Sequence, residues 1–272
     1  DQLGGTTAVE ILKLLLEKHP ESIRHGDNEG LLPIHLAART GKSADFCRVL
    51  IEAYPDSIRV GDHKDQLPIH WACMHNTVDA VEYLYNCFPD AINHTTSQGL
   101  YPIYSTLSSR GGRRNSVAAV EVVRFLLDCD PNVKLQKCRG MSLLYNACLL
   151  KPYIETGIEL VNTIYDAHPE AIEDDEFVQS IQDFDLVVQL YLERQLVYAR
   201  QARDLRLMMT IDGSGRLPLH IALQNNVTLG SIKLLVKGNP TALHFSDNCG
   251  ATPLHIACEH HDSASVVKYL VG

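Results

Sequence analysis

Short apolar runs alternate with polar turns along most of the chain, and the runs are of two kinds. The first kind, at residues 32–38, opens with a proline and continues through apolar residues to two alanines. Proline suits the first position of a helix because the missing N–H has no partner there. The second kind follows a Gly-Lys-Ser break and is apolar at helical spacing, at Phe46, Val49 and Leu50. We therefore predict an inner helix and an outer helix between residues 27 and 61.

The breaks between these runs are also regular. The outer helix is expected to stop at Tyr54-Pro55, because proline cannot continue a helical hydrogen-bond ladder. The same ending recurs at Pro20, Pro89, Pro131, Pro169 and Pro240. Turn residues at positions 27–30, with Gly30 free to take a positive φ, predict the tip of a projecting finger before each inner helix.

One motif repeats at a nearly constant interval. It reads LPIHLAA from Leu32, LPIHWAC from Leu67, LPLHIAL from Leu217 and TPLHIAC from Thr252, with worn copies at 101–104 and 142–145. The prolines are 35, 34 and again 35 residues apart. A period near 33 with T-P-L-H-x-A is the ankyrin signature. The chain thus resembles an ankyrin-repeat array, and is similar to the proline-terminated variant of microalgal arrays.

The resemblance implies an all-α solenoid of stacked helix pairs with short β-hairpin fingers. We predict one domain over 1–272. It would contain an N-terminal half repeat (1–26), four repeats (27–61, 62–95, 96–136, 137–172), a degenerate repeat (173–211), a further repeat (212–246) and a truncated one (247–272). Both ends are half repeats without a polar cap, and natural arrays need caps. This favours an excerpt of a longer protein.

Two stretches depart from the period. A polar, glycine-rich loop at 108–116 is inserted into the third repeat. The segment Asp183 to Arg206 has no glycine or proline and predicts one long amphipathic helix. Such a helix could dock a partner helix or simply fill its place in the stack. A capping box at Thr7 predicts the start of the first outer helix.

Composition narrows the class of protein. The net charge of −9 argues against nucleic acid as a partner, since nucleic-acid-binding proteins usually carry a basic patch. No apolar run approaches the length of a membrane span, and the first residues lack a signal-peptide pattern. Cysteines recur at one repeat position, as Cys73, Cys148 and Cys258, and so read as small core residues. We expect an intracellular, cytoplasmic protein without cofactors.

The resemblance also implies a binding surface. In ankyrin arrays the concave groove is lined by finger tips and by the exposed end of each inner helix. The matching positions here are Glu29, Leu31, Arg39, His63, Lys64, Gln66, Met74, His75, Gln98, Leu100, Arg139, Met141, Leu149, Leu150, Arg216, Gln224, Asn248 and Glu259.

Five of these positions are apolar where the fold does not require it: Met74, Leu100, Met141, Leu149 and Leu150. Grouped in mid-array they would form an exposed apolar patch, and such patches mark interaction sites. The alternative is that the worn fourth repeat buries them. We predict a partner peptide or domain that docks across the second to fourth repeats.

Other candidate sites have structural interpretations that are favoured. The motif histidines sit at one repeat position each, where they can hydrogen-bond the backbone of an adjacent loop. His255, Cys258, His260 and His261 form the densest cluster of metal-ligand types, but no second pair at ligand spacing completes four ligands. Ser116 follows Arg113-Arg114-Asn115, which resembles a kinase site, and is equally an ordinary helix N-cap.

The sequence therefore predicts a protein–protein interaction module or scaffold without catalytic activity. One alternative is the regulatory or targeting arm of a larger kinase, ubiquitin ligase or channel. A remote alternative is a metal-dependent enzyme built on the cluster around His255.

Overall fold

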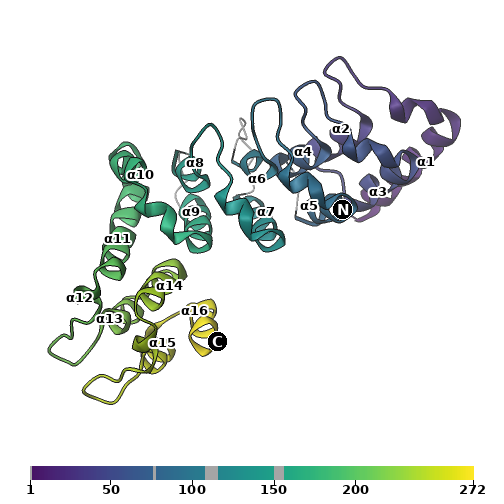
Figure 1. Ribbon diagram of the computed structural model, residues 1–272. Coiled ribbons are helices and arrows are strands. Elements are labelled where there is room, and N and C mark those ends of the chain that lie inside the picture. The colour runs from purple at the N-terminus through teal and green to yellow at the C-terminus, as the bar shows by residue number, and fades with distance from the viewer. Residues whose placement is uncertain (1, 76–77, 108–115, 150–155) are drawn as a thin grey trace. The chain divides into compact units, whose positions relative to one another are not determined.

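The computed structural model describes residues 2–75, 78–107, 116–149 and 156–272. Where the sequence predicts one array, the structure groups into two compact units, residues 1–146 and 147–272. Each unit is described by itself below. In both, short helices follow one another in pairs (Figure 1).

The first unit alternates inner and outer helices. The outer helices end in short 3-10 turns that begin at prolines, as the sequence predicts. In chain order the elements are α1 (Gln2–Lys18), η1 (Pro20–Arg24), α2 (Pro33–Arg39), α3 (Ala44–Ala53), η2 (Pro55–Arg59), α4 (Pro68–His75), α5 (Val78–Cys87), η3 (Pro89–Asn93), α6 (Pro102–Ser105), α7 (Ser116–Cys129), η4 (Pro131–Leu135) and the start of α8 (Leu143–Leu149).

The second unit has the same pairs at its end and an irregular stretch before them. Its elements are α9 (Thr156–Ala167), η5 (Pro169–Glu173), α10 (Asp175–Ser180), η6 (Ile181–Asp183), α11 (Leu186–Arg203), α12 (Leu205–Met208), α13 (Pro218–Gln224), α14 (Leu229–Gly238), η7 (Pro240–His244), α15 (Pro253–His260) and α16 (Ala264–Val271).

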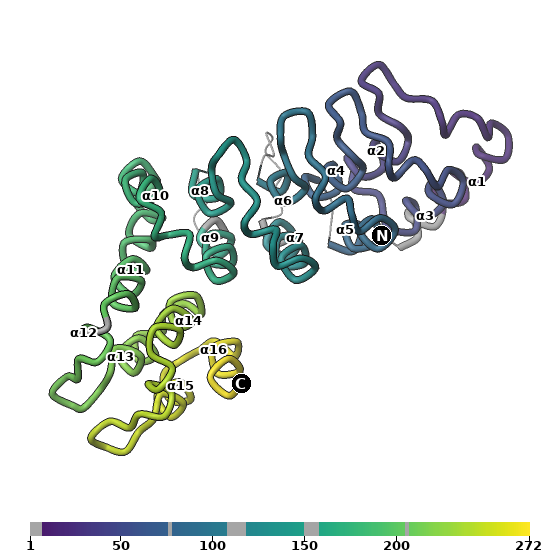
Figure 2. Tube along the Cα trace, in the orientation of Figure 1, coloured from purple at the N-terminus to yellow at the C-terminus, as the bar shows by residue number. Residues whose placement is uncertain are grey.

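Small residues allow the helices to stack closely. Ala37 and Ala38 on α2 and Ala72 on α4 are buried, at or below 3% exposure. The Cα trace in Figure 2 shows α2, α4 and α6 following one another along the first unit, with a finger loop before each. The all-α solenoid predicted from the sequence is confirmed.

Two of the motif histidines, His35 and His220, link their repeat to the next one. The His35 ring accepts the Leu32 N–H at Nδ1 and lies 3.0 Å from the Val60 carbonyl oxygen through Nε2. His220 reaches the Phe245 carbonyl in the same way, at 3.1 Å. In the worn third copy the Tyr104 hydroxyl replaces the imidazole and donates to the Gln136 carbonyl at 2.6 Å. These histidines therefore have the backbone-bonding role that the sequence predicts.

The fingers are shaped mainly by side-chain acceptors at their bases. Among the described residues the one β-bridge joins Cys138 and Met141, so the expected hairpins are otherwise turns. One carboxylate oxygen of Asp27 accepts the N–H groups of Glu29 and Leu31, both at 2.9 Å. These two bonds lower the pKa of Asp27. In four further fingers one side-chain oxygen accepts the same pair of backbone hydrogen bonds, at Asp62, Thr96, Asp212 and Asp247.

Neighbouring fingers within a unit are joined by backbone bonds. The His63 N–H donates to the Glu29 carbonyl at 3.0 Å, and the Ser97 N–H donates to the Lys64 carbonyl at 2.8 Å. In the second unit the Asn248 N–H donates to the Ser214 carbonyl at 3.0 Å. The spacing of the finger tips is thus set by the main chain.

This close approach predicts unequal costs for two similar glycines. Gly215 and Gly250 have φ values of +77° and +78°, so alanine is strained at both, by about 1 kcal/mol. A Cβ at Gly215 would also lie 2.9 Å from the Asn248 backbone nitrogen, whereas nothing lies within 4 Å at Gly250. We expect Gly215→Ala to cost about 1–3 kcal/mol more than Gly250→Ala in urea unfolding. Equal costs would show that Asn248 moves aside freely.

The degenerate repeat differs from its predicted form. The long helix begins at Leu186 rather than Asp183, because Asp185 caps it by accepting the Val187 N–H at 3.0 Å. It ends at Arg203, where Asp204 turns to extended backbone. The capping box predicted at Thr7 is wrong as a helix start, since α1 already begins at Gln2.

A buried polar network holds this repeat in place. The Gln195 amide oxygen on α11 accepts the Ser231 hydroxyl of α14 at 2.7 Å. Ser231 also lies 3.1 Å from the hydroxyl of Tyr165 on α9. All three side chains are buried, Gln195 at 2% exposure. Three helices are joined at one point that carries no repeat motif.

Candidate partner-binding surface

The first unit carries an aromatic and cationic stack on its inner helices. Trp71, Met74 and His75 are spaced i, i+3 and i+4 on α4, so they share one face. The Arg39 guanidinium carbon on α2 lies 5.5 Å from the centre of the Trp71 ring. The His75 ring stacks on the same indole, at 6.1 Å and 15° between planes. Arg39, Trp71 and His75 are called the stack below.

A finger aspartate orients this stack. One carboxylate oxygen of Asp62 binds the finger backbone, and the other accepts the Trp71 indole N–H at 3.2 Å. Glu29, on the preceding finger, lies 3.9 Å from the Arg39 guanidinium. Burial first, and then the Arg39 charge, lower the pKa of His75. The stack therefore offers one cation, a held indole and an imidazole that resists protonation.

The structure places the predicted groove residues in three classes of exposure. Arg39, Met74, Leu100, Met141 and Arg216 are partly exposed. Two residues, Leu31 and Gln66, are buried, at 1% and 7% exposure. Their burial corrects the prediction that they line the groove. Both follow the finger tip at the point where the aspartate binds their N–H groups and the chain turns back into the stack of helices. The exposed ones are Glu29, His63, Lys64, His75, Gln98, Arg139, Leu149, Gln224, Asn248 and Glu259.

The predicted mid-array patch is only partly described. Met74, Leu100 and Met141 belong to the first unit, and Leu149, 50% exposed, belongs to the second. Leu150 lies outside the described residues. The patch stays a prediction as a single surface.

Sequence reasoning missed Trp71. The prediction used only the last residues of each inner helix, here Met74 and His75. The helical spacing from those two residues back to Trp71 was the available signal. Leu36 holds the equivalent position one repeat earlier, 35 residues before Trp71.

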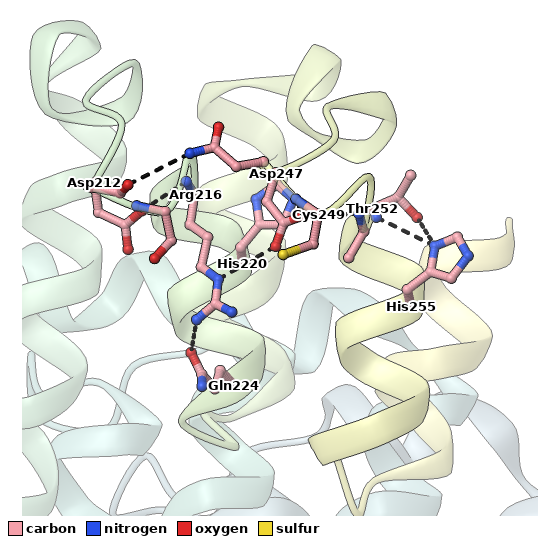
Figure 3. A network of polar contacts seen from close by, with 12 residues as sticks. Asp212, Arg216, His220, Gln224, Asp247, Cys249, Thr252 and His255 are labelled. Carbon is pink, nitrogen blue, oxygen red and sulfur yellow. Dashed lines mark hydrogen bonds and ion pairs between the residues drawn. The ribbon is translucent and has the colours of Figure 1, made fainter.

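In the second unit two predicted groove residues bind each other and the next finger. The Arg216 guanidinium donates to the Gln224 amide oxygen at 2.8 Å and lies 3.4 Å from the carboxylate of Asp247 (Figure 3). The Asp247 side chain is 2% exposed, and its other oxygen binds the backbone of its own finger. Bonds from the Ala251 and Cys249 N–H groups and from Arg216 lower the pKa of Asp247. This network joins two repeats.

The cluster of metal-ligand types around His255 is divided among separate partners. His255 Nδ1 lies 2.7 Å from the Thr252 hydroxyl. Figure 3 shows the two side chains facing each other. His261 is bonded at both ring nitrogens, to the Val227 carbonyl and to the Ser263 N–H. Across the described part of the chain, no group of three or more His, Cys, Asp or Glu is placed to hold a metal ion.

The proposed phosphorylation site falls at an edge of the described residues. Residues 108–115, which include its arginines, lie outside them. The helix α7 begins at Ser116, but the side chain of Ser116 is also outside the description. The N-cap and kinase-site interpretations both stay predictions.

Two further observations concern the state of the cysteines and the search for a helix that could cross a membrane. All eight cysteines are free. Cys73 and Cys148 are buried in the core, and burial raises the pKa of each thiol. Cys258, at the same repeat position, is exposed on the last inner helix. Within the described residues, no helix combines the length and apolar character needed to cross a membrane.

Comparison with known proteins agrees with this architecture. The family described as ankyrin repeats (3 copies) matches residues 5–98 and 178–272. The chain belongs to the ankyrin-repeat family, whose members are protein-interaction modules.

Further comparisons add little about a partner. A search of curated proteins finds no match. A solved structure that is similar contains the predatory endopeptidase Bd0816 of Bdellovibrio bacteriovorus in complex with the immunity protein Bd3460. The match has 16% identity, covers 91% of this chain and 98% of the other, and has a TM-score of 0.37.

Proposed function

We propose that the chain is a non-catalytic binding module that captures a partner protein through the inner-helix face of its first unit. The stack of Arg39, Trp71 and His75 anchors the partner there. Finger-tip residues Glu29 and Lys64 lie on the rim. We also propose a cytoplasmic location, which suits eight unpaired cysteines.

The stack is the observation that carries this proposal. Tryptophan and arginine are the residue types that most often dominate the binding energy of protein interfaces. Trp71 is also held in one orientation by Asp62, so little side-chain freedom is lost when a partner binds. A surface with a pre-oriented indole beside a cation suits a partner that inserts an apolar or acidic side chain.

The test is affinity capture with matched baits. We expect a protein held by the unaltered chain to be lost from Arg39→Glu and from Trp71→Leu, each at a cost of about 2 kcal/mol or more. Leucine is the residue that this chain has at the equivalent position 36, so the repeat should tolerate it.

The control bait is Arg48→Glu. Arg48 lies on the outer helix α3 with its side chain 51% exposed, and it should keep the partner. Circular dichroism would establish that all baits are equally folded. A partner retained by both stack variants would contradict the proposed surface.

Trp71 also provides a direct reading of binding. It is the only tryptophan of the chain, so its emission reports on the stack alone. A captured partner without tryptophan should shift that emission on titration. An unchanged emission together with tight binding would place the interface elsewhere.

A further inference from the structure

The second finger and the stack share one carboxylate, that of Asp62. Its Oδ1 accepts the N–H groups of Lys64 and Gln66, at 2.8 and 2.9 Å, and these two bonds shape the finger. Its Oδ2 accepts the indole N–H of Trp71 on α4, at 3.2 Å. Because both oxygens belong to one rigid carboxylate, the finger bonds and the indole bond cannot shift independently.

This connection is peculiar to the second finger. The indole stands nine positions after the finger aspartate, and Trp71 is the only tryptophan of the chain. The residues nine positions after the other four finger acceptors are Leu36, Ser105, Ile221 and Ile256. None of these side chains has a ring N–H to donate. The second repeat therefore has a link from its finger to its inner helix that the sequence of the other four does not provide.

The second finger is also held by its two neighbours. The His63 N–H donates to the Glu29 carbonyl of the first finger at 3.0 Å. The Lys64 carbonyl accepts the Ser97 N–H of the third finger at 2.8 Å. The main chain thus fixes where the second finger stands, and the carboxylate at its base passes this position on to the indole.

We propose that Asp62 is a positioning residue that couples the second finger to Trp71, so that a partner binds the finger tip and the indole as one cooperative event. Contact at the finger tip orders the finger, and the ordered carboxylate then holds the indole in place. Coupling between two places on a protein is reciprocal, so an indole held by the partner also steadies the finger. The effect on binding rests on the proposed function, whereas the coupling itself belongs to the unbound chain.

The coupling favours one kind of partner. Lys64 is exposed at the finger tip, and Trp71 is partly exposed on the inner helix. A segment that places an acidic residue at Lys64 and an apolar residue at Trp71 gains from both contacts and orders the connection only once. A ligand that reaches the indole alone lacks the contribution of the finger and binds more weakly.

The chain itself indicates a variant that separates the two roles of Asp62. Thr96 stands at the equivalent place in the third finger, 34 residues later. Its hydroxyl oxygen accepts the N–H groups of Gln98 and Leu100, both at 3.2 Å. Asp62→Thr should therefore keep the finger bonds and lose the bond to the indole. Trp71→Phe removes the N–H from the other side and keeps an aromatic ring.

Time-resolved fluorescence anisotropy and acrylamide quenching measure the freedom of the single indole. We expect Asp62→Thr to increase the amplitude of fast indole motion and the quenching rate of Trp71. The matched control is Asp27→Thr, the same change in the first finger, which should leave both unaltered. Circular dichroism establishes that the variants are equally folded. An indole as immobile in Asp62→Thr as in the unaltered chain overturns the proposal.

Hydrogen exchange measures the coupling in the reverse direction. Trp71→Phe should speed the exchange of the Lys64 and Gln66 amides about fivefold, the effect of one hydrogen bond of ordinary strength. The Glu29 and Leu31 amides, which Asp27 holds, provide the internal reference and should not change. Equal exchange of the second-finger amides in both chains means that the indole does not steady the finger, and the coupling then fails.

The consequence for binding is tested by a double-mutant cycle on the protein that the unaltered chain captures. Asp62→Thr should weaken binding about fivefold in the unaltered chain and about twofold or less in Trp71→Phe, where no indole bond remains to be lost. Equal losses in the two backgrounds overturn the cooperative binding. If no protein is captured, the proposed function and the cooperative binding both fail, while the two measurements on the unbound chain still decide the coupling.

Discussion

Replacing Gln195 with leucine is expected to lower the free energy of unfolding by about 2–3 kcal/mol, although the two side chains are of similar size. The Gln195 amide oxygen accepts the Ser231 hydroxyl at 2.7 Å and lies 3.4 Å from the Thr228 hydroxyl. Leucine offers no acceptor. Leaving a buried donor without a partner costs about 1–3 kcal/mol, and the Tyr165 contact to Ser231 weakens as well.

Urea unfolding followed by circular dichroism measures this loss. The control is Gln182→Leu, at an exposed glutamine on η6, where we expect a change of about 0.5 kcal/mol or less. A similar small change at Gln195 would mean that the hydroxyls find other partners. Ser231→Ala, made in the Gln195→Leu background, should then cost little further, because the bond is already lost.

Lowering the pH from about 7 to about 4 should destabilise the protein through its buried histidines. Burial, together with the neighbouring His94, lowers the pKa of His70 from 6.5 to about 4. The folded chain thus holds His70 neutral while the unfolded chain takes up a proton. Stability is fully present above pH 6.5 and is lost as the pH falls towards 4, by up to about 3 kcal/mol from this residue.

Other histidines add to the loss in the same direction. Burial lowers the pKa of His35, His75 and His220 as well. Urea unfolding at several pH values measures the sum. His70→Tyr should flatten the pH dependence, since Tyr104 already fills the equivalent position and does not titrate in this range. An unchanged pH dependence in His70→Tyr would contradict the assignment to His70.

The regular part of this fold was predictable because each repeat uses the same residues for the same contacts. Proline at 33, 68, 218 and 253 starts an inner helix in each case, and the prolines after the outer helices start 3-10 turns. The histidine bond to the next repeat followed from its one-per-repeat position. Periodicity carries information only where a local interaction is repeated.

The features that the sequence did not predict depend on contacts that are not repeated from one repeat to the next. The hydrogen-bonded group of Tyr165, Ser231 and Gln195 has no sequence motif at any of its members. Ser231 is 66 positions from Tyr165 and 36 positions from Gln195. The burial of Leu31 and Gln66 depends on how the finger turns back, which the finger aspartates determine. Trp71 belongs to the candidate site through a contact with Arg39 from the preceding repeat. The first two features leave no pattern along the chain, and the one signal for Trp71 was its helical spacing from Met74 and His75.

Successive fingers are joined by backbone hydrogen bonds, whereas their side chains determine which partner is recognised. Because the tips are joined through the N–H of His63 and the carbonyl of Glu29, their side chains take no part in the joint. Glu29, His63, Lys64 and Gln98 can therefore be exchanged without loosening the array. A library randomised at these four positions should yield chains that fold alike and differ in what they recognise, so new specificity can arise here with little loss of stability.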